Sequence, residues 1–200
     1  MSAQEIKVSD NKLDFGQFYF SYAKYHYNDT NKWLHIIFIP TIVFTLVGML
    51  HYGKVFGGFD LLGLHFQIDI GFILLAVLLP MYLFVDLVTG IVSSMIFITQ
   101  LLISTWLYSS YKSDPSHFQW LVWLHVAAWI AQFVGHGIFE KRAPALLDNM
   151  LLMFVAPFFF VFEVLNIFFG YKHKEVIEWN KYVAKEIKQY RDSKIKKRSQ

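Results

Sequence analysis

Residues 133–149 read FVGHGIFEKRAPALLDN, and this polar segment joins two long apolar runs. We take residues 120–139 as one helix and place successive side chains at about 100° per residue. Four polar side chains then lie on or near one side of an otherwise apolar helix: His125, Gln132, His136 and Glu140. Ionisable groups at membrane depth are costly and are often functional. On spacing alone, a functional stripe and a hydrogen-bonded helix end both remain open.

The composition is that of a membrane protein. Hydrophobic residues make up 56% of the 200 residues and aromatic residues 19%, which is more than a soluble domain with a hydrated surface carries. The chain has no cysteine, so disulfides and thiolate metal sites are excluded. Residues 1–14 are polar, do not resemble a signal peptide and are expected to form a flexible lead.

Long apolar segments organise residues 15–170 into one membrane domain. These segments are residues 33–50, 71–108, 118–139 and 146–169. The second is too long for one span and predicts a hairpin of two helices. Residues 15–27, rich in Phe and Tyr, predict an interfacial helix, and residues 51–67, with four glycines, predict a loop. The expected fold is all-α: a polytopic membrane helical bundle with about four to five membrane-embedded helices and interfacial amphipathic helices at both termini.

The basic charge is concentrated in residues 171–200, which hold ten Lys and Arg against four Asp and Glu, whereas the first 170 residues hold eight against eleven. Apolar side chains recur there every three or four positions: Val176, Trp179, Val183, Ile187 and Tyr190. This pattern predicts a basic amphipathic cytosolic tail that lies on anionic lipid. Because the phosphates of a bilayer account for this charge, no nucleic-acid partner is expected.

The distribution of Lys and Arg predicts the membrane topology. Basic residues gather in the tail, at residues 141–142 and, more thinly, before Trp33, and the positive-inside rule places all three in the cytosol. Four spans place both termini on the cytosolic side, but a fifth full span would carry the tail across. Residues 146–169, interrupted by Pro157, are therefore expected to bend or to pack without crossing fully.

Three histidines and one carboxylate are predicted to meet near the cytosolic surface: His26, His35, His136 and Glu140. The turn-forming residues 28–31 allow the chain to fold back between the first two. His125 lies about 16 Å from His136 along the helix, so it is expected to be a hydrogen-bonded core residue. Imidazole ligands without sulfur suit Fe(II) or Zn(II). The closely spaced histidine boxes of membrane di-iron enzymes and the Gly-x-Ser-x-Gly elbow of hydrolases are absent.

Two stretches resemble the signatures of one enzyme family. The amino-terminal stretch contains YHYN at 25–28, Asn31, LH at 34–35 and FIPT at 38–41. The carboxy-terminal stretch contains WI at 129–130, QFVGHG at 132–137, FEKR at 139–142, PAL at 144–146, DN at 148–149, AP at 156–157 and FE at 162–163. They are similar to the Fe(II)-dependent 2-hydroxy fatty acid dioxygenases, multi-pass proteins of the endoplasmic reticulum membrane in the α-oxidation branch of phytosphingosine breakdown. The resemblance covers roughly residues 15–169 and leaves out the lead and the tail.

The resemblance implies a reaction that depends on Fe(2+). A 2-hydroxy long-chain fatty acid and O₂ give the acid one carbon shorter, and the carboxyl carbon leaves as CO₂. The catalytic and metal-binding residues implied are His26, His35 and His136, with Glu140 as a further ligand.

The resemblance also implies roles beside the metal. Arg142 is expected to neutralise the substrate carboxylate, and Asn31 is a further expected substrate-binding residue. Ala143 stands where a second arginine is expected. Asn31, Asp148 and Asn149 are expected to orient the imidazoles through hydrogen bonds, although helix capping explains Asn31 and Asp148 equally well.

Two other functions remain open from the sequence. One is a zinc-dependent membrane lipid hydrolase that uses the same histidines with Glu140 as its base. The other is a non-catalytic protein that shapes membranes or binds lipid, in which the histidines are structural. Iron, zinc or no metal in the purified protein distinguishes the three. Nothing in the sequence specifies an oligomeric state.

Overall fold

The computed structural model describes residues 15–144, Leu147, Met150 and residues 152–198, with the backbone alone given at 194, 197 and 198. The predicted lead, residues 1–14, lies outside the described residues. The elements are α1 (Phe15–Ala23), α2 (Asp29–Leu50), β1 (Val55–Leu61), β2 (Leu64–Asp69), α3 (Ile70–Val85), α4 (Leu87–Tyr111), α5 (Pro115–Val134), the π-helix η1 (Gly135–Glu140), α6 (Leu152–Phe169) and α7 (His173–Arg198). The expected all-α membrane bundle is confirmed.

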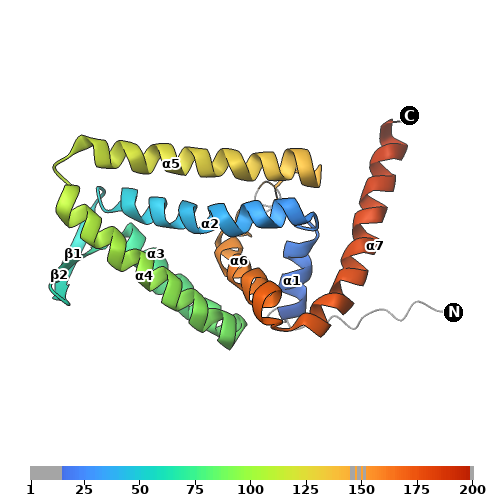
Figure 1. Ribbon diagram of the computed structural model, residues 1–200, viewed down its shortest axis with the longest axis horizontal. Helices are drawn as coiled ribbons and strands as arrows, with labels where there is room; N and C mark the ends of the chain where they lie inside the picture. Colours follow the sequence, from blue (N-terminus) through green and yellow to red (C-terminus); the bar gives the residue numbers. More distant parts are fainter. Residues whose placement is uncertain (1–14, 145–146, 148–149, 151, 199–200) are drawn as a thin grey trace.

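The long apolar helices form the body of the molecule. Within the described residues, α2, α4, α5 with η1, and α6 are each long and apolar enough to cross a membrane, whereas α3 is shorter. Figure 1 shows α2 and α5 side by side and α3 with α4 as a hairpin. The start of α2, the end of α5, α1 and α7 lie at one end of the bundle, and the two strands lie at the other (Figure 1). The basic segments therefore share one end, and the cytosolic orientation of that end stays a prediction.

Side-chain caps fix where the apolar helices begin. Asn28 accepts hydrogen bonds from the N–H groups of residues 30 and 31 at the start of α2. Asp69, Asp86 and Asp114 each accept a backbone N–H at the starts of α3, α4 and α5. These residues satisfy donors that the first helical turn leaves without partners. Short polar residues between apolar runs thus divide the chain into its helices.

The segment predicted as a loop, residues 51–67, is largely a β-hairpin. β1 pairs antiparallel with β2, and the connecting residues Leu62 and Gly63 have φ of 52° and 74°. Two residues with positive φ form the tight turn that suits the twist of two paired strands. Glycine is unfavourable in strands, so the sequence indicated a loop, whereas the backbone hydrogen bonds between the two strands stabilise a hairpin.

The predicted break at Asp86 separates α3 from α4, as expected for a helical hairpin. Its carboxylate caps α4 and accepts hydrogen bonds from Tyr171 at 3.0 Å and Lys172 at 2.5 Å. Burial opposes the charge on Asp86, but the hydrogen bonds from Lys172 and Thr89 prevail and hold its pKa below the usual range. The hairpin is thereby tied to the segment that joins α6 to α7.

α6 contains a run of six consecutive buried residues, 158–163. It stays one helix through Pro157, and Figure 1 shows it inclined to α2 and α5. Its partial crossing of the membrane stays a prediction. Phenylalanine rings of α6 pack against the rings of Phe15 and Tyr19 in α1.

The apolar stripe of the tail contacts protein, and the position of the tail helix on anionic lipid stays a prediction. Val176, Val183 and Ile187 are buried, and the Trp179 ring lies 5.2 Å from that of Tyr19 in α1. The Tyr19 hydroxyl also donates to Asn180 at 3.1 Å. Because α1 already covers the apolar face, the lysine-rich face is the part of α7 left for a membrane surface.

Candidate metal centre

Three histidines from distant parts of the chain converge at the end of the bundle that carries α1 and α7. His26 lies in the loop after α1, His35 in the second turn of α2 and His136 in η1. One ring nitrogen from each lies within 4.8 Å of the other two, and all three residues are buried. The fold-back at residues 28–31 brings His26 and His35 together as expected. Among the described residues, this trio is the group of potential ligands placed to share one ion.

Hydrogen bonds to the backbone fix which nitrogens face the centre. His26 Nδ1 lies 2.9 Å from the Tyr22 carbonyl oxygen, and His35 Nδ1 lies 2.8 Å from that of Asn31. A carbonyl oxygen only accepts, so each Nδ1 must carry the proton and each neutral ring has its lone pair on Nε2. The two Nε2 atoms are 3.0 Å apart. Two lone pairs that face each other repel, so a proton or a metal ion between or beside them stabilises this arrangement.

The donor set fits a metal ion. At a metal–imidazole distance of about 2.0–2.1 Å, two nitrogens held about 90–110° apart on one ion are about 2.9–3.4 Å from each other. The separation of 3.0 Å between the two Nε2 atoms falls in this range. His136 adds a third imidazole with a buried Nδ1 that has no partner. Burial, followed by the neighbouring His35 and His136, lowers the pKa of His26 well below its usual value, which keeps its lone pair available.

Glu140 holds the loop that carries His26. The expected α-helix over residues 120–139 ends at Val134 and continues as a π-helix, in which the Lys141 N–H bonds to the His136 carbonyl five residues earlier. Glu140 Oε2 accepts from the N–H groups of Tyr27 at 3.0 Å and Asn28 at 2.9 Å. The carboxylate therefore joins η1 to the start of α2. Its predicted role as a metal ligand stays a prediction.

Asn31 occupies the space between these elements and is completely buried. Its amide donates to the Tyr25 carbonyl oxygen at 3.2 Å and to Glu140 Oε2 at 3.3 Å. A Cβ on Gly135 would lie 2.4 Å from Asn31 Oδ1, so only glycine fits at that position. The contacts show Asn31 as a residue that positions His35 and Glu140, and its predicted contact with substrate stays a prediction.

Arg142 lies between two aromatic rings. Its guanidinium carbon is 4.0 Å from the ring centre of Tyr25 and 4.3 Å from that of Tyr190 in α7, and Nη1 donates to the Lys24 carbonyl oxygen at 3.0 Å. Arg142 thus links the tail helix to the loop before His26. It also lines an open hollow beside Pro144, where its role in binding a carboxylate stays a prediction.

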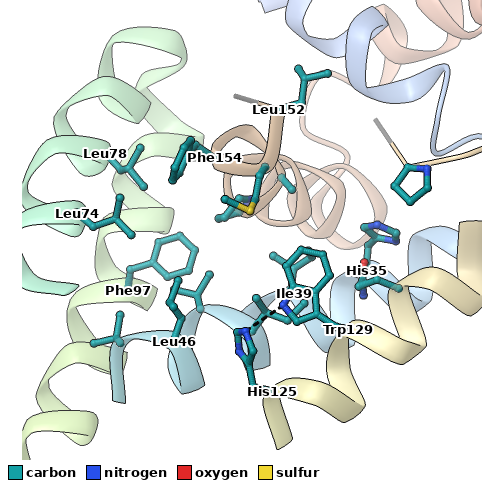
Figure 2. A pocket seen from close by; sticks show the side chains of 18 of the residues that line it. His35, Ile39, Leu46, Leu74, Leu78, Phe97, His125, Trp129, Leu152 and Phe154 are labelled. Carbon is teal, nitrogen blue, oxygen red and sulfur yellow. Dashed lines mark hydrogen bonds between the residues drawn. The ribbon is translucent and has the colours of Figure 1, made fainter. Parts of the chain in front are cut away.

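A long apolar cavity of about 270 Å³ begins at the three histidines and continues between α2, α3, α4, α5 and α6. Figure 2 shows His35 at one end and Leu74 and Leu78 at the other. His125 lines the middle, where Nδ1 lies 2.8 Å from the Thr45 hydroxyl oxygen and Nε2 accepts from Trp129 at 3.0 Å. His125 is therefore the hydrogen-bonded residue that the helix spacing predicts.

Comparison with known proteins decides the family. Residues 13–168 match the family described as "2-hydroxy-palmitic acid dioxygenase Mpo1-like". The chain belongs to the Mpo1-like family. A relative is the 2-hydroxy-palmitic acid dioxygenase MPO1 of Saccharomyces cerevisiae, which is 36% identical over 146 residues that cover 72% of this chain and 75% of the yeast protein. No solved structure matches the chain.

The Mpo1-like match includes every predicted site residue, but not all of them can be placed. Asp148 and Asn149 lie outside the described residues, so their orienting role stays a prediction. The sequence reasoning missed Tyr22, whose ring stacks on His26 at 4.1 Å, and Tyr190 in the tail. The spacing of Tyr22 and His26, one helical turn apart, was a usable signal for the first. No local signal indicates that Tyr190 reaches Arg142.

Proposed function

We propose that the chain is an iron-dependent membrane dioxygenase that shortens 2-hydroxy long-chain fatty acids by one carbon. The overall change is 2-hydroxy acid plus O₂ to the acid one carbon shorter, CO₂ and water. The observation that carries the proposal is the pair of backbone-fixed imidazoles whose Nε2 lone pairs meet at the head of an apolar cavity. The printed names of the family and of the yeast relative support the substrate class.

The cavity supports a substrate with a polar head and a long apolar tail. Its head is formed by His26, His35 and His136, and most of the remaining lining is aliphatic or aromatic. Burying an alkyl chain there contributes about 0.8 kcal/mol per methylene, which favours long-chain acids. The hollow lined by Lys141 and Arg142 adjoins the cavity at Phe133 and Pro144, and we assign it to entry of the carboxylate from the membrane surface.

Some residues of the site would bind the metal ion, and others position these ligands. His26, His35 and His136 would hold Fe(II), which supplies the activation of O₂ when bound. The Tyr22 and Asn31 carbonyl oxygens keep the Nδ1 protons of two ligands in place and so orient the rings. Glu140 fixes the loop that carries His26, and the apolar walls exclude bulk water from the reacting carbon.

The contacts of Glu140 favour a positioning role over that of the general base in the hydrolase alternative. Glu140 Oε2 accepts three hydrogen bonds, from Tyr27, Asn28 and Asn31. These bonds tie the carboxylate to the loop that carries His26 and to the start of α2.

The test is incubation of anaerobically purified protein with 2-hydroxypalmitate and Fe(II), followed by O₂, with detection of pentadecanoic acid and CO₂. His26→Ala, His35→Ala and His136→Ala should each lose turnover and bound iron, because each removes one of the three imidazoles of the candidate metal centre. His125→Ala is the matched control and should retain iron, since both ring nitrogens of His125 bond to Thr45 and Trp129. Zinc in place of iron, or no C15 product, would refute the proposal.

We also propose that this reaction takes place in the endoplasmic reticulum membrane, with both termini in the cytosol. The support is the set of four apolar helices long enough to span a bilayer and the gathering of basic segments at one end of the bundle.

A further inference from the structure

One residue that lines the cavity carries a side-chain acceptor without a partner. Within the described part of the chain, ten buried side-chain nitrogen and oxygen atoms lack a hydrogen bond, and two of them belong to residues that line the cavity. These are Nδ1 of His136, which belongs to the candidate metal centre, and Oε1 of Gln132. Gln132 is 4% exposed and lies one helical turn before His136.

The orientation of the Gln132 amide is determined by its other end. Nε2 donates to the Leu34 carbonyl oxygen at 3.2 Å. An oxygen in that position would face another oxygen, so the amide cannot flip, and Oε1 must be the free end. An unpaired buried acceptor costs free energy that a donor from a ligand restores.

The other polar groups of the cavity already have partners. Both ring nitrogens of His125 are bonded, and the indole N–H of Trp129 is one of their donors. Apart from the histidine cluster, Gln132 is therefore the described lining residue of the cavity that carries a side-chain acceptor without a partner. An alkyl chain has no donor, and an ionised carboxylate has none either. A hydroxyl group beside the carboxylate does.

We propose that Gln132 Oε1 accepts the hydrogen bond of the 2-hydroxyl group, so that Gln132 selects 2-hydroxy acids over unsubstituted fatty acids. This inference rests on the proposed function. Gln132 acts as a specificity-determining residue, because an acid without the hydroxyl leaves Oε1 buried and unpaired. A site built around a hydrogen bond rejects analogues that lack it far more strongly than an apolar pocket rejects a missing methylene.

Gln100 provides a matched control. It also donates its amide to a backbone carbonyl of α2, that of Pro40 at 3.2 Å, and its Oε1 is also buried without a partner. Gln100 does not line the cavity. Replacing it removes the same groups from a similar position between helices, so it reports the effect of the change on packing alone.

The test compares equilibrium binding of 2-hydroxypalmitate and palmitate to the full-length, Fe(II)-loaded protein in lipid nanodiscs without O₂, by displacement of a fluorescent fatty acid. Gln132→Met should weaken the binding of 2-hydroxypalmitate about tenfold and leave that of palmitate unchanged, because loss of one hydrogen bond at about 1.4 kcal/mol is a factor of ten. Gln100→Met should keep the wild-type ratio of the two dissociation constants.

A ratio unchanged by Gln132→Met overturns the inference. If that variant does not fold, wild-type protein is titrated with 2-fluoropalmitate, which has a substituent of similar size but no O–H donor. Binding as tight as that of 2-hydroxypalmitate would overturn the inference, and weaker binding supports it. A different result would refute the proposed function: wild-type protein would form no pentadecanoic acid on addition of O₂. If only the inference about Gln132 is wrong, the wild-type protein still forms pentadecanoic acid.

Discussion

The two glycines beside His136 should respond in opposite ways to the same substitution. A Cβ on Gly135 would lie 2.4 Å from Asn31 Oδ1 and 3.3 Å from Leu34 Cδ1, whereas a Cβ on Gly137 would meet nothing within 4 Å. Asn31 is completely buried and cannot move aside freely. Gly135→Ala must therefore displace Asn31, and Gly137→Ala need displace nothing.

The cost of Gly135→Ala can be worked out from these contacts. Overpacking costs about 1–3 kcal/mol, and displacement of Asn31 breaks its hydrogen bonds to the Tyr25 carbonyl oxygen and to Glu140, each worth about 0.5–1.5 kcal/mol. The gain from alanine over glycine in a helix offsets about 0.5–1 kcal/mol. A net loss of about 3 kcal/mol lowers the melting temperature by about 6–12 °C for a chain of this length.

The assay is thermal unfolding in detergent followed by circular dichroism, with the iron content of each variant. Iron affinity should fall about 10–100-fold for Gly135→Ala, because the Asn31 carbonyl oxygen orients His35. Gly137→Ala should match the wild-type melting temperature or exceed it by a few degrees. A Gly135→Ala protein that melts with the wild type, or equal destabilisation by both changes, would refute the reasoning.

Three further predictions concern the ends of the bundle. Asp86→Asn should destabilise the protein by about 1.5–3 kcal/mol in urea titrations, because it removes the charge-assisted hydrogen bond from the partly exposed amine of Lys172. The pKa of Asp86 is lower in the folded protein, so its ion pair stabilises the wild type above the unfolded pKa of about 3.9, and this stability is lost as the pH falls through the folded value. The free energy of unfolding of the variant should lack this pH dependence. A variant with the pH profile of the wild type would contradict the prediction. Changing Lys174, Lys185 and Lys188 to Glu should weaken binding to anionic vesicles, measured by flotation, by about 1 kcal/mol per residue. α7 should stay folded, because its apolar face packs on α1. Flotation equal to that of the wild type would exclude lipid contact by the lysine-rich face. Tags at both termini should be cleaved by protease in intact microsomes, and a protected carboxy-terminal tag would place the tail in the lumen.

The sequence alone determined the features that depend on local chemistry. Apolar segments long enough for a bilayer predicted the spans, and Asn28 and Asp86 marked where helices begin. These features follow from the free energy of burying contiguous side chains and of satisfying the first N–H groups of a helix. The turn at residues 28–31 also indicated that His26 and His35 meet.

Only the tertiary structure decided what each polar group contacts. Glu140 bonds to Tyr27, 113 positions away in the chain, and no local pattern distinguishes that partner from a metal. The stripe of α7 has the amphipathic pattern of a membrane-surface helix, but α1 covers it with aromatic rings such as Tyr19. An apolar face is stabilised equally by lipid or by protein, because both remove it from water. The sequence therefore specified which groups must be buried, and the packing of helices distant in the chain determined their partners.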